Sequence, residues 1–361
     1  MRTVKIGIIG CGGIANGKHM PALKGLDNVE LVAFCDIIEE RAVKAAKEFG
    51  TPDAKVYTDY KELLKDNTIE IVHVCTPNRS HSFISIDAME SGKHVMCEKP
   101  MAKTYAEGVA MVEAAKRTGK KLSIGYQYRQ NPDVLYIKAE CDKGTLGDIY
   151  FAKAHAIRRR AVPTWGVFLN EEEQGGGPLI DIGTHALDIT LWCMNNYKPK
   201  LVVGKAFKKL GDQTNTANAW GDWDPKEYTV EDSAFGFIVM ENGAVISLES
   251  SWALNSLETG EGQTTLCGTL GGADNHGVAG QARINGVKNN RQYVEIPDLK
   301  AGGVAFYDSK SETNSDIDAR LWIDAVINDK DPVVLPEQAL VVTQILEAIY
   351  KSNETGQAVI L

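Results

Sequence analysis

Asp181 and His185 stand four residues apart, directly after three glycines and Pro178, in the second half of a 361-residue chain. Glycines followed by a proline predict a helix start, and residues four apart lie on one face of a helix. A histidine that a carboxylate orients can accept a hydroxyl proton, because the imidazole pKa lies near neutral pH. The alternative is a structural histidine beside an aspartate that stabilises the helix dipole. We favour proton transfer because a dinucleotide-binding pattern occurs in the same chain.

Lys99 is the third residue whose position could support chemistry. It follows an apolar run, residues 94–97, that predicts a strand, and it stands between Glu98 and Pro100. The proline restricts the Lys99 backbone to extended geometry, and a cis bond would fix the direction of the amine. Such a lysine can hydrogen-bond a substrate hydroxyl and, where partly desolvated, exchange protons near neutral pH. A surface salt bridge with Glu98 is the alternative.

The elements that must position these side chains begin at the N-terminus. Residues 4–9 predict a strand, a glycine-rich turn and a helical run follow, and a second predicted strand, residues 29–35, ends at an acid. This order is typical of a dinucleotide-binding unit, because glycines allow the tight turn and the close approach of the pyrophosphate to a helix N-terminus. We expect cofactor contacts from Gly10, Gly12, Gly13 and Ile14.

Asp36, the acid that ends the second strand, favours NAD over NADP. Its carboxylate can accept hydrogen bonds from the ribose hydroxyls, whereas a 2′-phosphate would meet a like charge. Ile37 and Ile38 supply no cation to offset that repulsion. Arg41, about one turn into the next predicted helix, could contact the cofactor and keeps NADP as the minor alternative.

Strand-like and helix-like runs alternate as far as residue 127, which predicts a doubly wound parallel sheet of the Rossmann class. Ligands of such sheets lie outside the carboxyl ends of the strands. The 76–78 stretch also fits an ordinary transition from a loop to a helix. At these strand ends we expect cofactor contacts from Thr76, Pro77, Asn78, His81, Glu98, Lys99 and Gln127.

Beyond residue 127, consecutive strand-like runs with short turns predict a large, mostly antiparallel sheet in an α+β fold. The expected strands are residues 148–159, 201–207, 233–240, 244–252 and 264–267, and the expected helices are residues 131–143 and 337–351. We therefore divide the chain into a dinucleotide-binding domain, residues 1–127, and a substrate-binding domain, residues 128–361.

Composition excludes several classes of function. A net charge of −9 argues against nucleic acid or an anionic membrane as the main partner. No apolar run reaches the length of about 18 residues needed to span a bilayer, and no signal peptide precedes the first strand, so we expect a cytoplasmic protein. Seven widely spaced cysteines without a CxxC pair predict reduced thiols and no metal site.

Substrate contacts are less clearly marked. The candidates that flank the predicted crevice are Arg129, Arg159, Trp165 and Thr184. Trp165 could stack on a sugar face, whereas the run 158–160 of three arginines is more often a solvated strand end. The segment 219–225 carries two tryptophans beside carboxylates, which suits a polyhydroxylated ligand but equally fits a packed loop or a subunit contact.

Together these motifs resemble the Gfo/Idh/MocA family of NAD(P)-dependent oxidoreductases over essentially the whole chain. The motifs that carry the resemblance, in order, read GCGGIA, TPNRSH, EKP, GYQYR and GGGPLIDIGTHALD. The resemblance implies that Lys99, Asp181 and His185 form the catalytic group and that the C-terminal sheet serves as a homo-oligomer interface. It also implies a sugar, glycoside or cyclitol substrate, with oxidation at C3 of a glycoside as one specific form.

The implied reaction is hydride transfer between a secondary alcohol carbon and the nicotinamide. His185 would take the hydroxyl proton, Lys99 would hydrogen-bond the same oxygen, and Asp181 would orient the histidine or a neighbouring hydroxyl. Two alternatives remain open. One is a glycoside hydrolase that uses NAD transiently, and the other is a non-catalytic NAD(P)-binding sensor, which would need neither Lys99 nor His185.

Overall fold

The computed structural model describes residues 2–214, 217–277, 280–299 and 312–361. The chain forms two compact units, one of Met1–Gln127 with Ser311–Leu340 and one of Tyr128–Lys310 with Val341–Leu361. Among the described residues, the helices are all too short or too polar for a membrane span.

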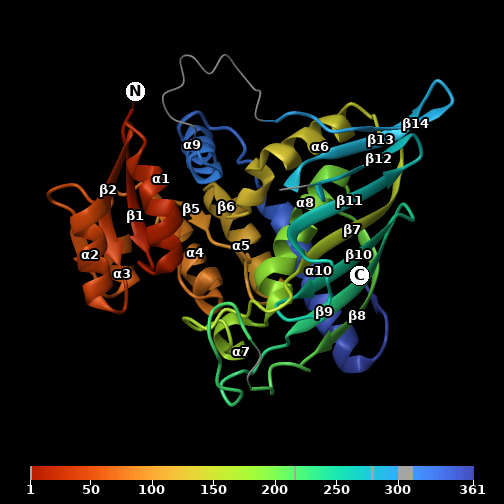
Figure 1. Ribbon diagram of the computed structural model, residues 1–361. Coiled ribbons are helices and arrows are strands. Elements are labelled where there is room, and N and C mark those ends of the chain that lie inside the picture. Colours follow the sequence, from red (N-terminus) through yellow and green to blue (C-terminus); the bar gives the residue numbers. More distant parts are fainter. Residues whose placement is uncertain (1, 215–216, 278–279, 300–311) are drawn as a thin grey trace. The chain divides into compact units, whose positions relative to one another are not determined.

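The first unit contains a six-stranded parallel sheet, which confirms the predicted Rossmann class (Figure 1). Its strand order, β3-β2-β1-β4-β5-β6, is the order of dinucleotide-binding folds. The strands are β1 (Val4–Ile9), β2 (Val29–Cys35), β3 (Lys55–Tyr57), β4 (Ile71–Val74), β5 (His94–Cys97) and β6 (Leu122–Ile124).

Helices connect these strands as the alternating pattern predicts. Thr104 and Glu107 form a capping box that starts α5, and Gly119 ends that helix with φ +66°. The helices of the first unit are α1 (Met20–Lys24), α2 (Glu39–Phe49), α3 (Tyr60–Leu64), α4 (His81–Glu90), α5 (Tyr105–Thr118) and α9 (Asn314–Ile327), with a π-helical turn at Ala15–His19 and a 3-10 turn at Asn78–Ser80.

Helix α9 was not predicted from the sequence, and neither were α7 and the strands β12 to β15 of the second unit. Helix α9 buries Trp322 and Ile323 in the core that contains Ile6, Met20 and Phe34. It therefore belongs to the first compact unit, outside the range 1–127 in which the sequence placed the dinucleotide-binding domain.

The second unit is built on a nine-stranded sheet with the order β14-β13-β12-β11-β7-β10-β9-β8-β15. Strands β7 and β10 are parallel and the other neighbours are antiparallel, which confirms the mostly antiparallel prediction. The strands are β7 (Ile149–Ile157), β8 (Pro199–Phe207), β9 (Ser233–Met240), β10 (Val245–Ser251), β11 (Gly260–Gly268), β12 (Gly271–Asp274), β13 (Arg283–Lys288), β14 (Arg291–Glu295) and β15 (Val359–Ile360).

One face of this sheet is covered by helices (Figure 1). Helix α8 packs against β7 and β11, and Ile349 of α10 fills the space above Gly204 and Gly236, where a Cβ atom would clash. The helices are α6 (Pro132–Asp142), α7 (Glu171–Gln174), α8 (Thr184–Met194) and α10 (Pro336–Thr355), with a 3-10 turn at Gln127–Gln130 and a π-helical turn at Leu179–Gly183.

Candidate active site

The glycine-rich turn after β1 has the geometry that a bound dinucleotide requires. Gly10 has φ +90°, and a Cβ atom on it would lie 2.6 Å from the carbonyl carbon of Cys75. A Cβ on Gly12 or Gly13 would meet no atom within 4 Å, and the Ile14 side chain is 42% exposed. The turn is therefore closed toward β4 and open on its other side, as a backbone that receives a pyrophosphate should be.

Asp36 is fixed beside this turn. Its carboxylate accepts hydrogen bonds from the backbone N–H of Cys11 at 2.8 Å and of Ile38 at 2.9 Å. Ile37 is 87% exposed, and Arg41 is exposed on α2. These residues fit a ribose next to a phosphate site, because the acid is held where the glycine turn meets the end of β2.

His81 links the two loops that follow β4 and β5. One ring nitrogen lies 2.8 Å from the carbonyl oxygen of Pro100 and the other 2.9 Å from that of Thr76. The Lys99–Pro100 bond is cis. The His81 side chain is fully buried, so its contacts favour a positioning role over the direct cofactor contact that we expected from the sequence. Asn78 begins the 3-10 turn that lies between Thr76 and His81 in the chain.

Glu98 is the centre of a buried polar cluster in the first unit. One carboxylate oxygen accepts from Lys18 Nζ at 2.9 Å and lies 2.7 Å from His19 Nε2, and the other accepts from the Lys99 backbone N–H at 3.0 Å. Burial alone would raise the pKa of Glu98, but Lys18 and His19 outweigh it and hold this pKa well below its usual range. Lys18 also donates to Gln127 Oε1 at 3.2 Å.

This cluster changes the interpretation of two predicted cofactor residues. Glu98 is 5% exposed, so its carboxylate lies in the interior of the first unit and not at the surface. Glu98 fixes the backbone at Lys99, whose side chain is partly exposed. Gln127 receives the Lys18 ammonium. Neither Lys18 nor His19 was identified from the sequence, because a lysine and a histidine in a helical run carry no signal for burial.

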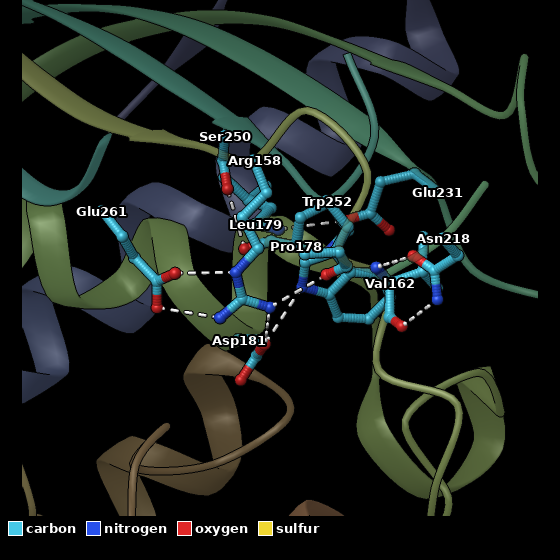
Figure 2. A network of polar contacts seen from close by, with 11 residues as sticks. Arg158, Val162, Pro178, Leu179, Asp181, Asn218, Glu231, Ser250, Trp252 and Glu261 are labelled. Atoms are coloured by element: carbon cyan, nitrogen blue, oxygen red, sulfur yellow. Dashed lines mark hydrogen bonds and ion pairs between the residues drawn. The ribbon is translucent and has the colours of Figure 1, made fainter. Parts of the chain in front are cut away.

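In the second unit, Asp181 lies in the π-helical turn and His185 in the first turn of α8. Asp181 accepts a hydrogen bond from Trp252 Nε1 at 3.0 Å, and Arg158 Nη1 lies 3.9 Å from the same oxygen (Figure 2). The His185 ring is 4% exposed and stacks on the ring of Tyr128, with centroids 4.4 Å apart. The structure thus gives the predicted acid an indole partner and the predicted base an aromatic one.

A buried acid, Glu231, holds the glycine run that precedes Asp181. Its carboxylate accepts from the N–H groups of Gly177 at 2.8 Å and Leu179 at 3.1 Å and from the Tyr350 hydroxyl at 2.9 Å. A Cβ on Gly176 would lie 2.1 Å from the Tyr350 oxygen, so this position needs glycine. Burial raises the pKa of Glu231 to about 7, although these hydrogen bonds lower it in part.

Arg158 forms a second anchor near Asp181. Its guanidinium donates to both oxygens of Glu261, at 2.7 and 2.8 Å (Figure 2). Burial, and then the Glu261 carboxylate, raise the pKa of Tyr128 to about 12, so the phenol stays protonated near neutral pH. The sequence did not reveal the roles of Arg158 and Tyr128. Tyr128 nevertheless stands between Gln127 and Arg129, which were both predicted site residues.

The four predicted substrate residues differ in their accessibility. Arg129 is fully buried and pairs with Asp188 of α8 through two hydrogen bonds of 2.6 and 2.9 Å. Thr184 is also fully buried. Both positions favour structural roles over the expected substrate contacts. Arg159 is exposed, and Trp165 is 52% exposed.

Comparison with known proteins gives consistent matches. The oxidoreductase family model for the NAD-binding Rossmann fold matches residues 4–126, and its C-terminal alpha/beta domain matches residues 138–361. D-glucoside 3-dehydrogenase of Escherichia coli strain K12 is 35% identical over 360 residues, 99% of this chain and 97% of the relative. Glucose-6-phosphate 3-dehydrogenase of Bacillus subtilis strain 168 is 31% identical over 252 residues, 68% of this chain and 67% of the relative.

A solved structure agrees in fold. Levoglucosan dehydrogenase in complex with NADH and L-sorbose superimposes with a TM-score of 0.83 at 21% identity, covering 100% of this chain and 99% of that one. A dinucleotide-binding Rossmann unit joined to a mostly antiparallel α/β unit defines the class, an NAD-binding oxidoreductase. The chain belongs to the Gfo/Idh/MocA family and is a dehydrogenase that acts on CH–OH groups.

Proposed function

We propose that this protein uses NAD to oxidise a secondary alcohol on the sugar ring of a glucoside, with C3 as the reacting carbon. The observation that carries the proposal is the segment of Asp181 and His185, held by Glu231 in a chain that is 35% identical to D-glucoside 3-dehydrogenase over nearly its full length. The 3-dehydrogenase relative from Bacillus subtilis supports the same ring position.

Three residues take the roles that the reaction needs. His185 accepts the proton of the reacting hydroxyl, and its stacking on Tyr128 fixes the plane of the imidazole. Lys99 donates a hydrogen bond to the same oxygen and stabilises its alkoxide character, while Glu98 holds the Lys99 backbone. Asp181, held by Trp252, orients the histidine or binds a neighbouring hydroxyl. The nicotinamide, when bound, accepts the hydride.

NAD rather than NADP is the proposed cofactor. Asp36 presents a carboxylate where the ribose would lie, and the two backbone N–H groups that bind it hold it in place. A 2′-phosphate at this position would be repelled. We propose that Gly12, Gly13, Ile14 and the loop of Thr76, Pro77 and Asn78 contact the rest of the cofactor.

The test is a substrate panel of methyl glucoside, free glucose and myo-inositol with purified protein and NAD. We expect NADH formation in proportion to a 3-keto glucoside, identified by NMR, with glucosides turned over faster than myo-inositol. Cleavage of a glycoside without net NADH would establish the transient-NAD hydrolase instead. Cofactor binding without either reaction would establish the sensor.

Cytoplasmic location and homo-oligomeric assembly stay predictions. Cell fractionation tests the first, and light scattering of the purified protein at several concentrations tests the second. A strictly monomeric protein would contradict the expected role of the C-terminal sheet as a subunit interface.

A further inference from the structure

We propose that Trp165 and Trp220 form a binding site for the group on the far side of the glycosidic oxygen, a planar aromatic or pyranose ring attached to the oxidised sugar. This inference rests on the proposed function, and it specifies the substrate as a glycoside with a ring-shaped aglycone. We call these two residues the tryptophan pair.

The tryptophan pair is exposed, which is unusual for two large aromatic side chains in contact. Trp165 is 52% and Trp220 is 43% exposed. Their rings meet edge to face, with centroids 5.0 Å apart and an angle of 75°. Although the two rings contact each other and Arg158 lies over Trp220, both indoles stay exposed, so part of their surface is available to a ligand. Exposed apolar side chains that lie next to each other are typical of binding surfaces, whereas single exposed ones are common everywhere.

The pair is connected to Asp181 by two short paths. The Arg158 guanidinium lies over the Trp220 ring at 5.1 Å, and its Nη1 is 3.9 Å from the Asp181 carboxylate. On the other path, Phe168 contacts Trp165 with centroids 5.9 Å apart and Trp252 with centroids 6.4 Å apart. Trp252 in turn donates to Asp181. A sugar bound at Asp181 would therefore have its neighbouring ring within reach of the pair.

The two loops that carry the pair are joined before any ligand binds. Val162 and Asn218 exchange two hydrogen bonds of 2.8 and 2.9 Å (Figure 2), and the Thr164 hydroxyl donates to the Trp220 carbonyl at 2.6 Å. A surface fixed in this way loses little conformational entropy when a ligand binds. These contacts favour a preformed ligand site over a loop that is merely packed.

Charge at the pair favours a neutral ring. Arg158, the cation next to Trp220, already donates to both oxygens of Glu261. What Arg158 adds to the tryptophan pair is the flat face of its guanidinium, which lies over the Trp220 ring and suits stacking. The hydrophobic C–H face of a pyranose and an aromatic ring share the shape that two tryptophans recognise.

The test compares kcat/KM for phenyl glucoside, for a β-linked glucose disaccharide and for methyl glucoside. The variants are Trp165→Ala, Trp220→Ala and the two Trp→Phe changes. We expect each alanine variant to lose at least about 10-fold more kcat/KM on the ring-bearing substrates than on methyl glucoside, and phenylalanine to restore most of the difference. Tyr150→Ala is the matched control, because Tyr150 is an exposed aromatic (58%) near the opposite end of β7 from Arg158.

A second measurement separates this site from the reaction. Phenyl 3-deoxyglucoside, which has no hydroxyl at C3, should quench tryptophan fluorescence in the wild type and bind at least about 10-fold more weakly to the double alanine variant. Equal losses on all three substrates would overturn the site. Turnover of methyl glucoside together with no binding preference for the phenyl analogue would also overturn it, while leaving the proposed function intact. Binding of the analogue to the pair without turnover of any glucoside would support the site and remove the proposed reaction.

Discussion

The phenol ring of Tyr128 lies almost parallel to the imidazole of His185, at an angle of 20° and a centroid distance of 4.4 Å. Tyr128 comes from the 3-10 turn at the start of the second unit, and His185 comes from α8. Tyr128 also packs against Gly262, where a Cβ atom would lie 2.3 Å from the ring. The imidazole is therefore oriented by an aromatic side chain that is itself fixed.

Replacing Tyr128 tests this orientation. Tyr128→Leu removes the stacked ring and should lower kcat at least about 10-fold. Tyr128→Phe keeps the ring and should therefore retain most of the wild-type kcat. Steady-state kinetics with methyl glucoside gives the comparison, and NAD titration checks that cofactor affinity is similar in both variants. Equal activity of the two variants would show that the ring does not position His185.

His185→Ala should lower kcat about 10²–10⁴-fold, because that is the usual contribution of a general base. NAD affinity should stay within about 2-fold of the wild type, since the cofactor residues belong to the first unit. Steady-state kinetics measures kcat, and quenching of tryptophan fluorescence by added NAD measures the affinity. A loss of less than 10-fold, which is about 1.4 kcal/mol, would assign the proton to another acceptor.

Asp36 should decide the choice of cofactor. Asp36→Ser combined with Ile37→Arg removes the negative charge and adds a cation at an exposed position, so that NADP affinity should rise about 10-fold or more relative to NAD. Ile37→Arg alone is the matched control. Isothermal titration with both cofactors measures the ratio. Comparable affinity of the wild-type protein for NAD and NADP would refute the specificity assigned to this carboxylate.

Glu231 should make stability depend on pH. Burial raises its pKa to about 7 in the folded protein, against about 4.3 in an unfolded chain. A raised pKa gives a contribution to stability that is complete below about pH 4.3 and is lost as the pH rises through about 7. Relative to Glu231→Gln, which does not ionise, the wild-type free energy of unfolding should fall by up to about 3 kcal/mol between about pH 4.5 and about pH 8.

Urea denaturation of both proteins at several pH values measures this difference. The glutamine also loses a hydrogen bond to the glycine run, so it is expected to be less stable at low pH. The test therefore compares how the free energy of unfolding of each protein changes with pH, and not its absolute value. Parallel pH profiles for the two proteins would show that Glu231 does not titrate in this range.

The ion pair of Arg129 and Asp188 should be needed for stability. Both side chains are fully buried, so Arg129→Met leaves an uncompensated carboxylate and should cost about 3–5 kcal/mol of unfolding free energy. The double variant Arg129→Met with Asp188→Leu should recover most of that loss, because it removes both charges. Chemical denaturation measures the set. A loss below about 1 kcal/mol for the single variant would contradict the structural role.

The sequence alone determined the parts of this protein that depend on local geometry. Gly10 needs a positive φ, and strands alternating with helices allow few arrangements other than a parallel sheet. The motifs around Gly10, Lys99 and His185 were therefore enough to predict the Rossmann class and the family, and the strand-like runs with short turns beyond residue 127 were enough to predict the mostly antiparallel second sheet. The residues of each such motif are close together in the sequence.

The tertiary structure decided the features that depend on distant contacts. Glu231 binds Gly177 across 54 residues, and Arg129 binds Asp188 across 59. Helix α9 enters the core of the first unit after eight of the nine strands of the second sheet. No local pattern distinguishes a buried acid or arginine from a surface one, because burial is set by which segments fold against it. For that reason Arg129 was expected to contact substrate, whereas Glu231 was not identified as a site residue at all.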